Sequence, residues 1–179
     1  MERVLNQLVD RLTKSYGDRL VSVVLYGSAA VGDHHGRFSD INILCVLREV
    51  TPRELGDSAA VFHWWQKLGN PSPLLFGLEE LRTSTDCFPI ECHDIRERHR
   101  ILLGEDVVQD LEVDDSFYRA QVEHELRAKL LRLRQKAAEA MEARDLLLGL
   151  LADSVSTFCV LFRHALLLHG VQAAFEKRT

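Results

Sequence analysis

The sequence predicts a protein that combines a sheet-containing domain, residues 1–110, with an all-helical region, residues 111–179. In the first part, short runs rich in valine, leucine and isoleucine alternate with segments of helical apolar spacing, which places it in the α/β or α+β class. In the second part, apolar residues recur only at helical spacing. A hydrophobic fraction of 46% and a charged fraction of 27% are ordinary for a globular protein, and 179 residues suffice for one sizeable core or two small units.

The first half of the sheet-containing domain begins with a helix. Residues 2–16 carry apolar side chains at helical spacing and predict an amphipathic helix. Residues 20–26 are apolar on both faces and predict a central strand. Residues 28–32 predict a short helix. Residues 40–47 predict the next strand, on which odd-numbered and even-numbered side chains face opposite sides of the sheet.

The second half of this domain continues the alternation. A helix is expected from about residue 51 to residue 67, with Pro52 in its first turn. Residues 74–76 predict a short strand, residues 79–84 a brief helix, and residues 88–95 a further strand.

Two long helices are predicted after residue 111, at 116–143 and 144–169. The second is apolar on nearly all sides, as in a helix inside a bundle. Two such helices alone would expose too much apolar surface, so they must pack on the first domain, on a second copy of the chain in a homodimer, on a helical partner protein, or on missing residues. The apolar run 146–162 has Asp153 near its centre and falls short of about 20 apolar residues, so we predict no membrane span.

Charge argues against a nucleic-acid partner. The net charge is −5, and residues 1–110 hold the whole acidic excess, with 12 basic and 17 acidic side chains. Neither half has the surplus of basic residues typical of a dedicated nucleic-acid binder. The amino terminus lacks the pattern of an export signal, and the four cysteines are expected to be reduced core thiols, which together predict a cytoplasmic protein.

The most specific motif lies between the first two predicted strands. Gly27 allows the backbone to approach a phosphate closely, and Ser28 stands at a helix start, where free N–H groups favour anions. Gly32 lets the loop turn back to the second strand. Asp40 and Asn42 project from the same face of that strand, about 7 Å apart at their Cα atoms. Oxygen-bearing side chains at this spacing can share divalent ions.

This layout resembles the signature of the nucleotidyltransferase superfamily, in which a glycine-serine pair and a loop glycine precede serine-aspartate-x-aspartate. The resemblance implies an α+β fold, with a mixed sheet flanked by helices and an all-helical C-terminal region. It implies that Gly27, Ser28, Gly32 and Ser39 bind the nucleotide, and that Asp40 and the residue at position 42 bind Mg²⁺. Antibiotic-modifying adenylyltransferases and small toxin–antitoxin proteins are members.

A third acidic residue is implied by the same resemblance, on a later strand, as a metal ligand or general base. Glu91 is the leading candidate, because in a strand at 88–95 it would lie between apolar neighbours, where an unpaired charge is costly. Asp94, on the other side of that strand, is the second candidate. A salt bridge from Glu91 to Arg96 or Arg98 is the structural alternative.

The resemblance implies transfer of a nucleoside monophosphate from an NTP to a hydroxyl of an unknown acceptor, with release of pyrophosphate. Asp40, Asn42 and Glu91 would hold the metal, and Asp40 and Glu91 would be catalytic. Asn42 departs from the pattern, because an amide offers a cation one neutral oxygen where a carboxylate offers a charge. The alternative is a catalytically degenerate protein that acts as a nucleotide-binding or antitoxin-type regulatory partner. The resemblance also implies that helical domains of this kind commonly continue beyond two helices, and it leaves open whether this chain is a shortened member.

Overall fold

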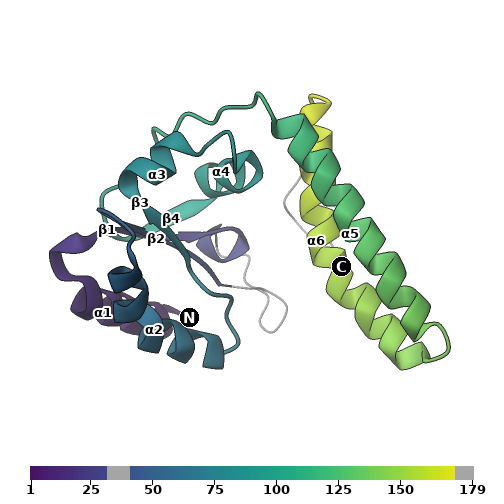
Figure 1. Cartoon of the computed structure of the whole chain (residues 1–179), viewed down its shortest axis with the longest axis horizontal. Coiled ribbons are helices and arrows are strands. Elements are labelled where there is room, and N and C mark those ends of the chain that lie inside the picture. The colour runs from purple at the N-terminus through teal and green to yellow at the C-terminus, as the bar shows by residue number, and fades with distance from the viewer. Residues whose placement is uncertain (32–40, 172–179) are drawn as a thin grey trace. The chain divides into compact units, whose positions relative to one another are not determined.

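The computed structural model describes residues 1–31 and 41–171. The chain divides into two compact units, Met1–Val113 and Asp114–Thr179. The first contains the sheet, and the second is helical (Figure 1).

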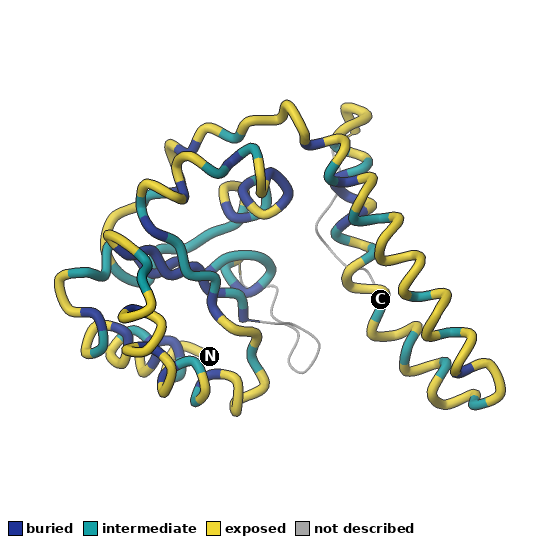
Figure 2. The backbone as a smooth tube through the Cα atoms, viewed as in Figure 1, coloured by how far each residue is buried: buried dark blue, intermediate teal, exposed yellow. Residues whose placement is uncertain are grey.

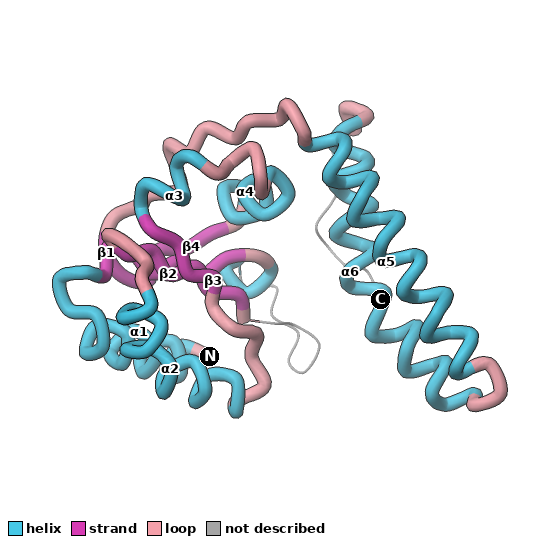
Figure 3. Tube along the Cα trace, viewed as in Figure 1, coloured by secondary structure: helices cyan, strands magenta, loops and turns pink. Residues whose placement is uncertain are grey.

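Four strands form one mixed sheet in the first unit (Figure 3). They are β1 (Leu20–Tyr26), β2 (Asn42–Leu47), β3 (Leu74–Gly77) and β4 (His99–Gly104), in the order β3-β2-β1-β4. Strand β1 pairs antiparallel with both β2 and β4, whereas β2 and β3 are parallel. The central position predicted for residues 20–26 is therefore confirmed, as is the mixed sheet.

Helices α1 (Glu2–Tyr16) and α2 (Pro52–Lys67) cover one face of the sheet (Figure 1). The buried side of α1 follows the predicted helical spacing, and the odd-numbered residues of β1 and β2 point toward it. Burial is concentrated on the strands and the inner sides of these helices (Figure 2). The core on this face includes Leu5, Leu8, Leu12, Leu25, Ile43, Cys45 and Trp65.

The opposite face of the sheet is covered by α3 (Leu78–Thr83) and α4 (Pro89–Glu97). Even-numbered strand residues point to this side, as the alternation of a strand requires. The core here includes Val24, Leu44, Val46, Leu81, Cys92, Ile95, Val108 and Leu111.

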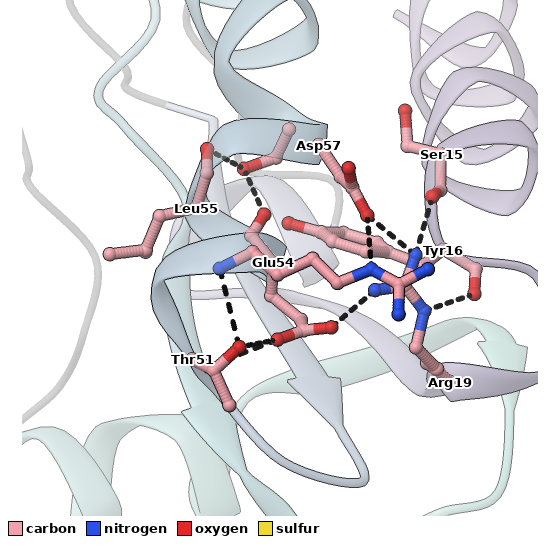
Figure 4. Close-up of polar contacts among 9 residues, drawn as sticks. Ser15, Tyr16, Arg19, Thr51, Glu54, Leu55 and Asp57 are labelled. Atoms are coloured by element: carbon pink, nitrogen blue, oxygen red, sulfur yellow. Dashed lines mark hydrogen bonds and ion pairs between the residues drawn. The ribbon is translucent and has the colours of Figure 1, made fainter.

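A polar cluster joins the end of α1 to the start of α2 (Figure 4). Arg19 donates to the Ser15 carbonyl oxygen at 3.1 Å, to Asp57 at 2.7 Å and to the carboxylate of Glu54. Glu54 also accepts from the backbone N–H and the hydroxyl of Thr51, which caps α2. Hydrogen bonds from Thr51 and from Arg19 outweigh burial and lower the pKa of Glu54 to about 2.

The strand predicted at residues 88–95 is wrong, because this segment is helix α4. Pro89 occupies its first turn, and the Cys92 N–H donates to the Phe88 carbonyl oxygen at 2.9 Å. Its buried residues are Pro89, Ile90, Cys92 and Ile95, and the burial of the adjacent Pro89 and Ile90 departs from the alternation of a strand. The fourth strand of the sheet is instead β4, which follows directly.

The second unit is a pair of helices, α5 (Tyr118–Ala140) and α6 (Arg144–Leu168), which contact each other. A buried polar group joins them, in which the Nδ1 atom of His164 lies 2.6 Å from the hydroxyl of Tyr118. Arg163 donates to the Nε2 atom of His164, because a guanidinium can only donate. The proton of a neutral His164 ring is then on Nδ1, where it donates to Tyr118.

Helix α6 is the one described helix that is long and apolar enough to cross a membrane, judged by length and composition alone. It was predicted to be enclosed in a bundle, but only 6% of its most apolar 18-residue window is buried. The expectation that this segment does not span a membrane stays a prediction.

Candidate functional site

The candidate site lies where β1 ends. Gly27 follows the last residue of β1 with a φ of 78°, a conformation that favours glycine. Its N–H donates to the carbonyl oxygen of Arg98, just before β4, at 2.9 Å, and its own carbonyl accepts from the Ala30 N–H at 3.1 Å. Ser28 opens a short 3₁₀ helix, η2 (Ser28–Val31), which Ala29 anchors in the core. The turn after β1 is therefore fixed by hydrogen bonds to the residue before β4 and within η2, and by the burial of Ala29.

Asn42 lies beside this turn. It is the first residue of β2 and lies opposite Tyr26 in the antiparallel pair. A Cβ atom added at Gly27 would lie 3.4 Å from the Nδ2 atom of Asn42. The amide of Asn42 thus lies next to the glycine. The predicted site residues Gly27, Ser28 and Asn42 are brought together at this end of the sheet.

Three of the predicted site residues, Gly32, Ser39 and Asp40, lie outside the described residues. Their proposed roles are therefore carried forward as predictions. The strand predicted to begin at Asp40 is described from Asn42 onward, with Ile41 buried just before it.

Glu91 lies on an exposed position of α4, not between the apolar neighbours of a strand. The expectation that Glu91 lies between apolar neighbours is therefore wrong. Its role as the third acidic residue stays a prediction. Asp94 lies three residues later, so on a helix the two carboxylates share one side, whereas in a strand they would point apart. Burial foremost, and then the charges of Glu91 and Asp94, raise the pKa of Tyr26 to about 12. Both carboxylates therefore act on the residue opposite Asn42.

Strand β4 contributes His99 to the same end of the sheet. His99 lies opposite Tyr26, and directly opposed residues of an antiparallel pair point to the same face. Its ring nitrogens lie 3.2 Å from the Arg96 carbonyl oxygen and 3.2 Å from the Asp106 carboxylate. Burial opposes ionisation of Asp106, but hydrogen bonds from His99 and from two backbone N–H groups still lower its pKa. The His99 ring is thus held from both sides.

The side chains at this end of the sheet offer some of the oxygen ligands that a hard cation needs. Amide and carboxylate oxygens are the ligands that Mg²⁺ prefers. Within the described ranges, however, no three histidine, cysteine, aspartate or glutamate side chains cluster closely enough to hold a metal ion. A metal site here would need Asp40 together with Asn42.

Tyr26 and His99 were not identified from the sequence. Tyr26 directly precedes Gly27, and that adjacency was an available signal. His99 is brought to the site by the pairing of β4 with β1, which no local spacing reveals.

Several solved structures are similar to this chain at low sequence identity. A mutant of the MntA-HpeT toxin–antitoxin complex is 19% identical with a TM-score of 0.40, over 78% of this chain and 98% of that one. A toxin–antitoxin structure with AMP-PNP is 20% identical with a TM-score of 0.39, over 76% of this chain and 98% of that one. A tri-AMPylated Shewanella oneidensis HEPN toxin in complex with an MNT antitoxin is 15% identical with a TM-score of 0.38, over 80% of this chain and 100% of that one. Similarities at this level carry no functional argument.

No curated protein matches the chain significantly. The family model described as the nucleotidyltransferase domain matches residues 5–141, which is well over half of the 179 residues. The match extends from α1 through the whole sheet and into the helical unit. This chain therefore belongs to the nucleotidyltransferase domain family.

Proposed function

We propose that this protein transfers a nucleoside monophosphate from an NTP to a hydroxyl group of an acceptor. Membership of the nucleotidyltransferase domain family supports this chemistry in general terms. The observation that supports the proposal for this chain is the position of Asn42 beside Gly27 at the ends of β1 and β2, where a Cβ atom added at Gly27 would lie 3.4 Å from the Asn42 amide nitrogen.

In the proposed reaction, the acceptor hydroxyl oxygen attacks the α-phosphorus of the NTP. A bond forms between this oxygen and the α-phosphorus, and the bond from the α-phosphorus to the oxygen bridging to the β-phosphate breaks. Pyrophosphate leaves, and the hydroxyl proton passes to a general base, for which Glu91 is the candidate. Correct placement and charge stabilisation account for most of the catalysis in such displacements.

Each site residue has a distinct proposed task. Gly27 and Ser28 would bind phosphate oxygens through the turn after β1, assisted by Gly32 and Ser39. Asp40 and Asn42 would hold Mg²⁺, which when bound would neutralise phosphate charge. Glu91 would complete the acidic set from α4.

The alternative is a nucleotide-binding regulatory partner of the antitoxin type that does not turn over. One observation supports it: the Asn42 atom within reach of a Cβ atom built on Gly27 is the amide nitrogen, a hydrogen-bond donor. A phosphate at Gly27 could accept from this amide without any metal. An aspartate at position 42 would instead repel a bare phosphate, so metal dependence separates the two functions.

Thermal unfolding of the intact chain with ATP, GTP, CTP or UTP, with and without Mg²⁺, tests the two functions. The transferase proposal expects stabilisation that requires Mg²⁺ and incorporation of label from an α-³²P-labelled NTP into an acceptor mixture. The binding alternative expects metal-independent stabilisation and no transfer. If no NTP stabilises the protein under either condition, both proposals are wrong.

Asn42→Asp sharpens this comparison. If Asn42 is a metal ligand, the added carboxylate should strengthen Mg²⁺-dependent NTP binding by about tenfold or more, since it adds a charge to the ion. If Asn42 donates to phosphate, the same substitution should weaken metal-free binding instead. Asn70→Asp, at a half-buried position just after the turn that follows α2, is the control and should change neither quantity.

A further inference from the structure

Helix α6 presents two apolar rows, and only one of them is covered. Residues facing α5 include Leu150, Ser154, Phe158, Leu161 and Ala165. A second row consists of Leu148, Ala152, Val155, Cys159, Phe162 and Leu166, all exposed in the described part of the chain. We call this second row the α6 seam.

The α6 seam has the spacing of a helix-packing interface. Its six members alternate steps of four and three residues along five turns, which is the heptad repeat. At 3.6 residues per turn, it lies roughly 120° around α6 from the row that packs on α5. A helix in a four-helix bundle contacts two neighbours through rows separated in this way. The α5–α6 pair supplies only one of these neighbours.

The polar residues of the helical unit favour a protein as the second neighbour over a lipid bilayer. No member of the α6 seam is charged, but Asp153, Ser154, Ser156 and Thr157 interrupt the other faces of α6 at mid-length. Helix α5, which contacts α6, is rich in charged side chains. Such charges are costly in hydrocarbon, whereas a helix interface needs only the seam to be apolar.

Two copies of the α6 seam fit each other when the two α6 helices run antiparallel with Thr157 of one at the level of Thr157 of the other. Leu148 then meets Leu166 of the second copy, and Val155 meets Cys159 of the second copy. Ala152, the smallest seam residue, meets Phe162, one of the largest, so the volumes of facing side chains compensate.

The residues that flank the α6 seam also fit this antiparallel pairing. The next heptad position before Leu148 is Asp145, and the next after Leu166 is His169. Both are exposed, and antiparallel pairing about Thr157 sets each against the other in the second copy. A carboxylate therefore faces a side chain that can donate to it, and no like charges oppose each other.

We propose that the α6 seam is a self-association surface, through which a second copy of this chain packs antiparallel to complete a four-helix arrangement. The seam spans about 27 Å, at 1.5 Å per residue. Such a short interface is at the low end of those that form stable complexes, so we expect a dissociation constant in the roughly micromolar range.

Analytical ultracentrifugation tests the proposal by measuring the molar mass at concentrations from about 0.01 to about 100 times the expected micromolar dissociation constant. The wild-type chain should shift from monomer to dimer across this range. Val155→Glu places a charge at the centre of the seam and should weaken association by at least tenfold. Leu146→Glu is the matched control: Leu146 is 68% exposed but lies on the far side of α6 from the seam, and its replacement should leave the dimer intact.

Val155 is 55% exposed, so its replacement should leave the helical circular dichroism signal unchanged. A wild-type chain that stays monomeric throughout, or equal association of both glutamate variants and wild type, would overturn the proposal. So would a monomer that binds phosphatidylglycerol vesicles through the seam, which would identify lipid as the occupant.

Cross-linking tests the direction of pairing. Leu148→Cys and Leu166→Cys are made in separate chains that also carry Cys87→Ser and Cys159→Ser. In the antiparallel register, a short bis-maleimide should link the two chains only when they are mixed, because identical positions lie about 27 Å apart along the helix axis. Linkage within each variant alone, with no link between the two different variants in the mixture, would show parallel pairing and refute the register.

Discussion

Gly27 and Asn42 meet at the end of the sheet, where a Cβ atom on the glycine would lie 3.4 Å from the amide nitrogen of the asparagine. Fifteen positions separate them in the sequence, and the antiparallel pairing of β1 with β2 brings them together. Because the positive φ of Gly27 directs its backbone to this point, the contact depends on glycine as much as on Asn42.

Gly27→Ala should therefore abolish NTP binding and lower the free energy of unfolding by about 1–2 kcal/mol, the usual cost of a left-handed conformation for alanine. Gly69→Ala is the control, because Gly69 has a φ of 86° and open space around its Cα, in a turn away from the site. Its backbone strain should be similar, and NTP binding should be retained. Urea unfolding and NTP titration measure the two effects. Equal NTP affinity in both variants would show that Gly27 does not take part in NTP binding.

Glu91→Gln should reduce NMP transfer by about 10²-fold or more if Glu91 is the general base. Stability should change by less than about 0.5 kcal/mol, because the residue is exposed on α4. Glu97→Gln, on the same helix, is the control: Glu97 is exposed and its charge is not among those that raise the pKa of Tyr26. Initial rates of label transfer measure the effect. If Asp94→Asn is inactive while Glu91→Gln is active, the acid is Asp94.

Glu54 should make the stability of the first unit fall in acid. Its pKa in the folded state is about 2, below the ordinary value of 4.5, so the stabilisation is complete above about pH 4.5 and is lost as the pH falls toward 2. Glu54→Gln should be less stable at neutral pH and should show a flatter dependence of Tm on pH in this window. Glu49→Gln, at an exposed position just before α2, should follow the wild-type curve. Parallel curves for wild type and Glu54→Gln would contradict the assignment.

Tyr118→Phe should destabilise the helical unit. The substitution leaves the Nδ1–H group of buried His164 without its 2.6 Å acceptor, which costs about 1–3 kcal/mol. Ser154→Ala is the comparison, since that hydroxyl donates only to the Leu150 carbonyl oxygen of its own helix, at 2.7 Å, and its loss should cost less than about 0.5 kcal/mol. Urea unfolding followed by circular dichroism measures both. A Tyr118→Phe variant as stable as Ser154→Ala would show that the hydroxyl contributes little.

Much of the first unit was predictable from local pattern. The bounds of α1 and β1 were predicted from apolar spacing to the residue, and the fold class is confirmed. The strand predicted at 88–95 is wrong because so short a stretch contains too few repeats of the apolar spacing to distinguish a strand from a helix. Pro89, in the first turn of α4, was the signal that pointed to a helix.

By itself, the sequence determined the family and the glycine-serine turn, because both depend on residue identity at close spacing. Only the tertiary structure decided which distant residues share the site. The pairing of β4 with β1 adds His99, and the helical form of 89–97 turns Glu91 and Asp94 to the same side. The physical reason is that strand pairing and helix packing depend on contacts across the whole core, whereas sequence spacing reports only the local backbone.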